Sequence, residues 1–268
     1  LRAPKLGDRL DSRWDSRPDS IVWLQGPEIA IGRSAGTGNT PSNSPSPRPR
    51  VVLVDFWEST CVHCLDTLPA LRAWHERYAA RGLAIVGVHT PEFEFTKRPE
   101  IVRATVDEER LSYSIVLDNH REIWTSFANR YWPAKYLIDA RGYLRYEHFG
   151  GGGFGETERW IQRLLREAGD DAAMPAPLEE GAEVVLGASC ARASQECFLG
   201  NFRRRLAIEK NFEDGEVFEH RGRSVPDDLS GFAGLRGRFR HEAEFVEALE
   251  AGAEVEVLCE AAGVHLVV

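Results

Sequence analysis

The sequence predicts an α/β layered domain with a central sheet, followed by a small all-β, sandwich-like domain. Between residues 51 and 168, short apolar runs alternate with segments whose apolar residues recur every three or four positions. This alternation is typical of strands that alternate with helices. Beyond residue 181, short strand-like runs follow one another. With 268 residues, the chain is long enough for two ordinary domains.

The first domain opens on VVLVDFW at 51–57, a continuous apolar run with one acid, which is typical of a strand buried on both faces. A helix with one apolar face should follow, and Pro69 should kink it. That face contains Leu65, Leu68, Leu71, Trp74 and Tyr78. The further predicted elements are a strand at 82–89, a helix at 99–111, a strand at 113–118, a helix near 120–130, a hairpin of 134–139 and 143–149, and a helix at 156–168.

The flanking segments differ in composition. Residues 21–31 predict two short strands around a Gly-Pro turn, whereas 33–50 consist mostly of Ser, Pro, Gly, Asn and Arg and predict a loop. The β domain should contain strands within EVVLGA, ECFLG, RRLAIE, GRFR, EVEVLC and VHLVV. We therefore divide the chain into an N-terminal segment (1–50), an α/β domain (51–168), a linker (169–181) and a β domain (182–268).

Composition excludes several classes of protein. The net charge of -9 argues against a general nucleic-acid binder, and the short Arg203–Arg205 run fits a solvated face. No run of 18 apolar residues predicts a membrane span. Five cysteines do not make a disulfide scaffold. The chain begins at Leu1 without a signal-peptide pattern, which fits a mature form or a soluble fragment of a longer protein.

The Cys61-x-x-Cys64 pair is the strongest candidate site. It follows the predicted strand at 51–57, so Cys61 should lie at a helix N-terminus, where free N–H groups stabilise a thiolate. Cys64 would lie beneath it, close enough to resolve a mixed disulfide. The alternatives are a zinc site and two buried small residues. A structural zinc site needs four ligands, and the other cysteines belong to another domain.

The pattern VDFW-x3-CxxC-x4-P resembles the thioredoxin family. Asp55 lies six residues before Cys61, where the family has a buried acid, and Pro69 lies where the family's helix is kinked. Trp132-Pro133 precedes the hairpin, where thioredoxin-like proteins have a cis-proline that faces the disulfide. The resemblance covers 51–168 and implies a thioredoxin-like three-layer domain with a mixed central sheet.

Within that family, the chain is similar to the TlpA-like and DipZ-like extracytoplasmic branch. The segment 90–131 is too long for plain thioredoxin, and GVHTPEFEF (87–95) and YWPAKYLID (131–139) resemble DipZ-like proteins. These proteins also have a later β domain similar to a carbohydrate-binding module. The Ser/Pro-rich loop and the lack of the membrane-spanning half of a full DipZ are departures. The resemblance implies a location in the periplasm or at the cell surface, as a soluble part of a membrane-anchored protein.

The resemblance also implies the roles of individual residues. Cys61 would be the nucleophile and Cys64 the resolving thiol. Asp55 would accept the proton of Cys64, and Glu92 would be a second acid near the disulfide. Residues expected to contact the substrate are Trp57, His63, Trp132 and Pro133. No cofactor is needed beyond the Cys61–Cys64 disulfide. The expected partners are protein thiols and disulfides and a membrane electron donor of the DsbD or DipZ type.

The direction of electron flow depends on opposing charges. A cationic His63 would stabilise the Cys61 thiolate and favour an oxidant. The acids Asp55, Glu58, Asp66 and Glu92 favour the disulfide and hence a reductase, and 51–71 contains no Lys or Arg. We expect a reductase.

Two other functions were weighed. A peroxidase of the peroxiredoxin type needs Pro seven and Thr three residues before its reactive cysteine, where this chain has Val54 and Glu58. A binding protein would use the β domain for a glycan or a protein partner, with a redox-inactive thioredoxin fold. Residues 182–268 contain Phe but no Trp or Tyr, which weakens the glycan hypothesis. Cys190 and Cys197 could form a second disulfide or remain free thiols.

Overall fold

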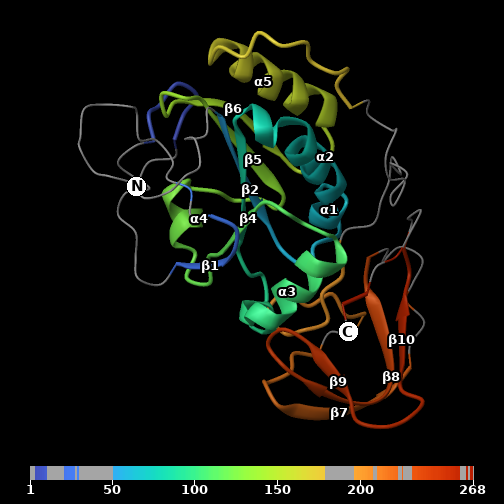
Figure 1. Ribbon diagram of the computed structural model, residues 1–268. Coiled ribbons are helices and arrows are strands. Elements are labelled where there is room, and N and C mark those ends of the chain that lie inside the picture. The colour runs from blue at the N-terminus through green and yellow to red at the C-terminus, as the bar shows by residue number, and fades with distance from the viewer. Residues whose placement is uncertain are drawn as a thin grey trace. The chain divides into compact units, whose positions relative to one another are not determined.

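A computed structural model of the chain describes residues 4–10, 21–27, 29, 51–178, 196–207, 210–222, 225, 231–259, 264 and 266–267. Contacts divide the chain into two compact units, 1–184 and 185–268 (Figure 1). The first unit contains β1 (Val22–Gln25), β2 (Val51–Trp57), α1 (Val62–Leu65), α2 (Leu68–Tyr78), η1 (Ala79–Arg81), β3 (Leu83–His89), η2 (Phe95–Lys97), α3 (Pro99–Glu108), β4 (Ser114–Leu117), α4 (Glu122–Ser126), β5 (Ala134–Ile138), β6 (Leu144–Phe149) and α5 (Phe154–Glu167).

The first unit is built on a six-stranded mixed sheet with the order β1-β4-β3-β2-β5-β6. β2, β3 and β4 are parallel, whereas β1, β5 and β6 are antiparallel to their neighbours. β2 lies between β3 and β5, so every one of its residues is buried. This placement explains why its sequence is a continuous apolar run rather than an alternating one.

Helices cover both faces of the sheet (Figure 1). Alternate residues of β2 point to opposite faces. Val51, Leu53 and Trp57 pack with apolar residues of α2, α3 and α5, whereas Val52, Val54 and Phe56 pack with residues of α4 and its C-terminal end. The result is the three-layer α/β arrangement that the sequence predicts.

The predicted kinked helix is two helices. The helix α1 ends at Leu65, with Asp66 as its C-cap. The helix α2 starts at Leu68 and has Pro69 in its first turn. Proline is well tolerated there because a first-turn N–H has no intrahelical partner. Of the two strands predicted in 21–31, the first is β1; residues 28, 30 and 31 lie outside the described ones.

Part of the predicted linker packs on the first unit. Arg81 on η1 forms a bidentate ion pair with Asp170, with nitrogen–oxygen distances of 2.7 and 3.1 Å. The N–H of Leu178 donates to the buried Glu158 carboxylate of α5 at 2.7 Å. Residues 179–195 lie outside the described ones. The predicted boundaries of the linker and of the β domain therefore stay a prediction.

The second unit contains an antiparallel sheet of β7 (Glu216–Arg221), β8 (Ala233–His241), β9 (Val246–Ala248) and β10 (Glu254–Val257). A small core packs against it, formed by Leu206, Phe212, Ala233, Leu235 and Phe239. The all-β character predicted for this part of the chain is confirmed.

Individual strands of this sheet were predicted less well. GRFR lies within β8 and EVEV forms β10, but Phe198 and Leu206 form only isolated bridges. β7 and β9 were missed, because neither has a clear apolar run. EVVLGA and residue 190 lie outside the described residues, so a Cys190–Cys197 disulfide stays a prediction. In the described part of the chain, no helix has the length and apolar character needed to cross a membrane.

Candidate active site

The two cysteines lie where β2 gives way to α1. Cys61 is the N-cap of α1 and is partly exposed, whereas Cys64 is fully buried. The backbone N–H of Cys64 points to the Cys61 sulfur, with a nitrogen–sulfur distance of 3.4 Å. Burial raises the pKa of the Cys64 thiol well above its usual range, and the nearby Cys61 and Asp55 act in the same direction. One sulfur is therefore reachable from solvent, and the other is held beneath it as a thiol.

Asp55 and Lys135 form a buried pair below the cysteines. They are direct cross-strand partners on β2 and β5, with 1% and 0% of their surface exposed. The two Asp55 carboxyl oxygens and the Lys135 amine have no hydrogen-bond partner among the described residues. Burial raises the pKa of Asp55 to about 7, and the positive charge of Lys135 limits the rise. Asp55 can therefore exchange a proton near neutral pH.

A second buried acid, Glu58, lies just before Cys61. Its carboxylate accepts hydrogen bonds from the backbone and hydroxyl of Thr60, and His89 lies 3.9 Å away. Burial raises the pKa of Glu58, and the negative charge of Glu92 adds to the rise. Burial lowers the pKa of His89 to about 3, so His89 is neutral. Glu92 is thus brought close to Glu58 rather than standing alone in its loop.

The loop before β5 contributes the other side of the site. The Trp132-Pro133 peptide bond is cis, as predicted. The Trp132 ring packs against Trp124 at a centroid distance of 4.4 Å, and the Arg121 guanidinium lies over both rings. Arg121 also donates to the Pro91 carbonyl at 2.8 Å, which ties this loop to the one that contains Glu92.

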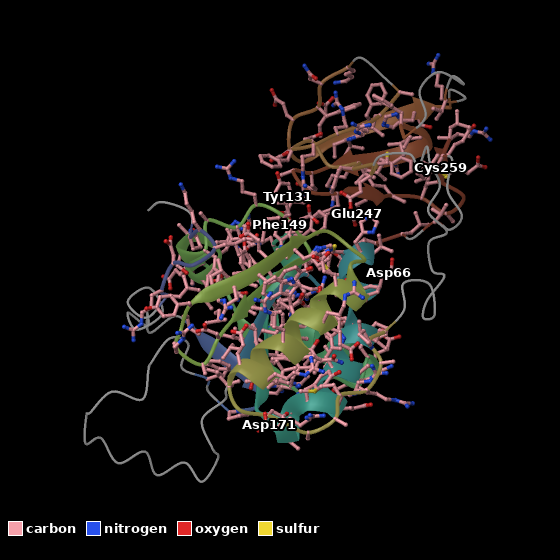
Figure 2. The ribbon with its side chains drawn as sticks, turned by 90° about the horizontal axis from the view of Figure 1, so that it is seen from above. Asp66, Tyr131, Phe149, Asp171, Glu247 and Cys259 are labelled. Carbon is pink, nitrogen blue, oxygen red and sulfur yellow. The ribbon has the colours of Figure 1, made fainter. Side chains whose placement is uncertain are left out.

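Two exposed aromatic rings lie beside this loop. Tyr131 and Phe149 are 56% and 44% exposed, and their ring centroids are 5.6 Å apart (Figure 2). Phe149 is the cross-strand partner of Ala134, directly after Pro133. Exposed rings in contact with each other can bind apolar side chains of another protein.

The predicted substrate-contacting residues differ in exposure. His63 is exposed and Trp132 is partly exposed. Trp57 is fully buried and contacts His89 edge to face, which corrects its expected contact with substrate: it forms the wall beneath the site. Pro133 is also buried, and its carbonyl accepts a hydrogen bond from the backbone N–H of Gly150.

Sequence reasoning missed Lys135 and Arg121. Lys135 is the one charged residue in the apolar run AKYLI, and a charge in an otherwise buried strand was a usable signal. Arg121 has a positive φ of 56° at the start of α4, which no sequence pattern announced. In the described part of the chain, no group of three or more His, Cys, Asp or Glu side chains is placed to hold a metal ion.

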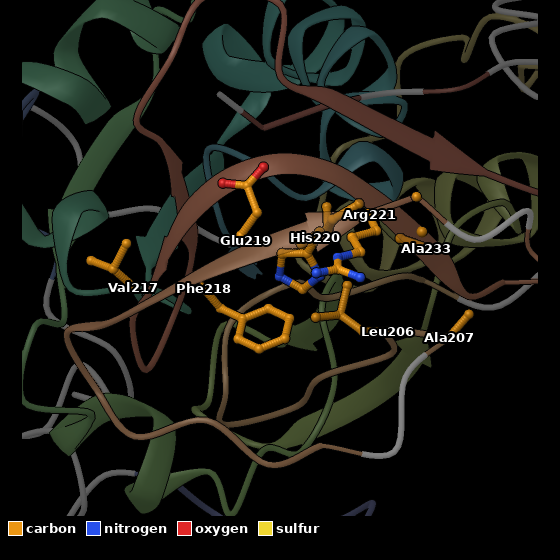
Figure 3. Close-up of a pocket in the computed structure, with 11 residues that line it drawn as sticks. Leu206, Ala207, Val217, Phe218, Glu219, His220, Arg221 and Ala233 are labelled. Carbon is orange, nitrogen blue, oxygen red and sulfur yellow. The ribbon is translucent and has the colours of Figure 1, made fainter.

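The second unit has a pocket of about 570 Å³ along β7 (Figure 3). Phe218, His220 and Leu206 line it together with Arg221, and none of its lining residues is Trp or Tyr. His220 and His241 face each other with 2.9 Å between their Nε2 atoms. The pocket and the histidine pair do not show that this unit binds a glycan.

Known proteins resemble the first unit. Residues 31–147 match the AhpC/TSA family. The chain is 43% identical to protein DipZ of Mycobacterium tuberculosis over 143 residues, which is 52% of this chain and 21% of DipZ. It is 30% identical to the thiol-disulfide oxidoreductase YkuV of Bacillus subtilis over 115 residues, which is 43% of this chain and 77% of YkuV. A solved thioredoxin-like protein in the oxidised form aligns over 61% of this chain and 98% of its own, with 25% identity and a TM-score of 0.49.

The chain belongs to the thioredoxin-like thiol-disulfide oxidoreductases, because it covers most of YkuV at this identity and has the sheet order and helices of that fold. It spans about a fifth of the length of DipZ, so the activity of that whole protein is not carried over. The residues typical of peroxiredoxins are absent, since Val54 and Glu58 take their places.

Proposed function

We propose that this chain reduces protein disulfides through Cys61 and Cys64, at a site outside the cytoplasm. The observation that carries the proposal is the asymmetry of the pair. Cys61 is partly exposed at the start of α1, and Cys64 is buried with its N–H directed at the Cys61 sulfur. Dithiol exchange needs one thiol that attacks and a second, shielded thiol that resolves.

The reaction would proceed in two steps. The Cys61 thiolate attacks a substrate disulfide, which forms a mixed disulfide and releases the first substrate thiolate. Cys64 then gives its proton to Asp55 and attacks the Cys61 sulfur. The second substrate thiolate leaves and takes up a proton, and the protein keeps the Cys61–Cys64 disulfide. Two electrons pass from the dithiol to the substrate.

The surrounding residues would bind the substrate and adjust the acids. The backbone of Trp132 has no hydrogen-bond partner among the described residues, so it can pair with an extended substrate. Tyr131 and Phe149 would contact apolar side chains beside the substrate cysteine, and His63 would contact it from α1. Glu92 would act on the site through Glu58, whose pKa it helps to raise.

The direction of transfer follows from the acids. Burial raises the pKa of Cys64, Cys61 and Asp55 add to the rise, and a disfavoured thiolate makes the dithiol a better reductant. Glu58 lies three residues before Cys61, and the negative charge of Glu92 acts on Glu58. A positive charge on His63, which is exposed on α1, would oppose them. On balance we propose a reductase.

The location and partners are proposed from the relatives. The similarity to DipZ supports work outside the cytoplasm, with electrons from a membrane donor of the DsbD or DipZ type. The substrates would be protein disulfides. No cofactor beyond the disulfide enters the proposed reaction.

A redox titration tests both the pair and its direction. The protein is equilibrated in thiol/disulfide buffers, free thiols are alkylated, and mass shifts are counted for the unmodified chain and for Cys64→Ala. A midpoint near about -270 mV supports a reductase, and one near about -120 mV supports a disulfide donor. Cys64→Ala should accumulate the mixed disulfide on Cys61. If Cys61 and Cys64 do not exchange at any potential, the alternative of a binding protein with a redox-inactive fold replaces this proposal.

A further inference from the structure

An arginine that the proposed reaction does not use lies beside the loop that would bind the substrate. Arg121 is the N-cap of α4 and is exposed. Its guanidinium carbon lies 5.2 Å from the centre of the Trp132 ring and 5.6 Å from the centre of the Trp124 ring. One of its nitrogens donates a hydrogen bond to the Pro91 carbonyl at 2.8 Å. The side chain is therefore held in place although solvent reaches it.

The backbone of Arg121 is fixed as well. Its φ is 56°, in the left-handed region that costs free energy in residues other than glycine. Its N–H donates to the Asp118 carbonyl at 2.9 Å. The buried Asp118 carboxylate in turn accepts from the N–H groups of Ile123 and Trp124 at 3.0 and 2.8 Å. These bonds fix the point from which the Arg121 side chain extends to the two rings.

Most of the hydrogen-bonding capacity of this guanidinium is unused. An arginine side chain has five N–H groups. In the described part of the chain, the Pro91 carbonyl is the one acceptor that Arg121 contacts, and no carboxylate forms an ion pair with it. Packing against aromatic rings leaves the N–H groups at the edge of a guanidinium available. Such an edge binds a carboxylate through two parallel hydrogen bonds.

The place of Arg121 relative to a substrate follows from Trp132. Trp132 precedes the cis bond to Pro133, and its backbone is the proposed partner of an extended substrate. Each residue of an extended chain advances by about 3.3 Å, so an acidic side chain about one or two residues from the substrate cysteine can reach across the Trp132 ring to the guanidinium. The acids Glu58 and Glu92 would repel such a substrate, and Arg121 would offset them.

We propose that Arg121 is a specificity-determining residue that selects protein disulfides with an aspartate or glutamate within about two residues of the cysteine that Cys61 attacks. The inference rests on the proposed function and names the class of its substrates. In the bound state, the Arg121 guanidinium donates hydrogen bonds to the substrate carboxylate while the Trp132 backbone pairs with the substrate chain. The contacts of Arg121 with Trp124 and with the Pro91 carbonyl exist before binding, so little side-chain freedom is lost.

The test compares peptides that differ in one charge. Each peptide has one cysteine, activated as a disulfide with thiopyridine, and a single Glu or Gln at one of the two positions on either side of it. The Cys61 thiolate attacks the peptide sulfur and releases thiopyridone, whose absorbance gives the rate, and Cys64 then displaces the peptide thiolate. Cys190, Cys197 and Cys259 are replaced by Ser in all proteins, which leaves two thiols. Dithiodipyridine, which carries no charge, is the control reagent.

The unmodified chain should react about fivefold faster with the Glu peptide than with the Gln peptide at one or more positions. An increase in ionic strength from about 0.01 M to about 1 M shortens the Debye length from about 30 Å to about 3 Å and should remove most of this preference. Arg121→Gln should lose the preference, and Arg121→Lys should keep part of it, because lysine retains the charge without the paired N–H groups. All variants should react with dithiodipyridine at the unmodified rate. The matched control Arg130→Gln, at an exposed arginine two residues before Trp132, should keep the preference.

Equal ratios of the Glu and Gln rates, within about twofold, in the unmodified chain and in folded Arg121→Gln overturn the inference, since a purely structural arginine would slow both peptides alike. A preference that disappears in Arg130→Gln instead also overturns it. If the unmodified chain reacts neither with dithiodipyridine nor with any peptide, the proposed function itself fails. Should the Arg121 variants not fold, the mixed disulfides of Cys64→Ala with the two peptides decide. A side-chain ¹⁵Nε signal of Arg121 that shifts with the Glu peptide alone supports the inference, and identical signals overturn it.

Discussion

Replacing Asp55 by Asn should make the reduced protein more stable at pH 8 and remove part of its pH dependence. The folded protein binds a proton at Asp55 more tightly than the unfolded chain does, because burial raises the pKa from 3.8 to about 7. Between these values the folded state holds a proton that the unfolded state lacks. The contribution of Asp55 to the free energy of unfolding is therefore fully present below pH 3.8 and is lost as the pH rises towards about 7.

The size of the effect follows from the shift. About three pKa units at 1.36 kcal/mol each correspond to about 4 kcal/mol, with 1% of Asp55 exposed to solvent. For a unit of this size, about 4 kcal/mol corresponds to roughly 8–16 °C in melting temperature. Cys64 stays a thiol up to pH 8 because its pKa is raised, so it adds no titration of its own.

The assay is thermal and urea unfolding of the reduced protein between about pH 4 and pH 8, followed by tryptophan fluorescence. Only the difference between Asp55→Asn and the unmodified chain is used, because His89 titrates with the opposite sign. Asp139→Asn is the matched control. Asp139 is also buried but accepts hydrogen bonds from Tyr143 and Arg145, which hold its pKa below the usual range, so this change should destabilise. Equal pH dependence in Asp55→Asn and the unmodified chain would refute the reasoning.

Three further outcomes are expected. Glu158→Ala should lower the free energy of unfolding in urea by about 3–5 kcal/mol, because four donors, three from α2 and one from Leu178, lose their buried acceptor. The control Glu167→Ala, at an exposed position, should lower it by under about 1 kcal/mol, and equal losses in the two variants would contradict this prediction. Burial lowers the pKa of His220 to about 4, so amides of the second sheet should lose hydrogen-exchange protection as the pH falls from 6.5 towards 4, and His220→Gln should weaken this loss. Phe149→Ala should raise KM for a protein disulfide about fivefold and leave the reaction with dithionitrobenzoate unchanged; an unchanged KM would remove Phe149 from the substrate surface.

The candidate site was predictable wherever its residues lie near each other in the chain. The strand at 51–57, the start of a helix at Cys61 and the acid of the strand all depend on local periodicity and spacing. The cis bond before Pro133 was predicted through the family resemblance. The break between α1 and α2 was not, because a proline in an apolar helical pattern fits both a kink and a first turn.

Charge was the property that the sequence described worst. The absence of Lys and Arg from 51–71 suggested a site in which acids outweigh His63. The sheet brings Lys135 opposite Asp55, and burial leaves Asp55 only partly ionised near neutral pH. A count of acids along the chain cannot include either effect, because both depend on which strands are neighbours.

The sequence by itself determined the alternation of strands and helices in the first unit, the closeness of Cys61 and Cys64 at the start of a helix and the all-β character of the second unit. These follow from spacing and periodicity, which act over a few residues. Only the tertiary structure decided that Trp57 is buried, that Glu92 acts on Glu58, and that Lys135 lies against Asp55. Such contacts join strands and loops far apart in the chain, and their energies come from burial and from charges that only the folded sheet brings together.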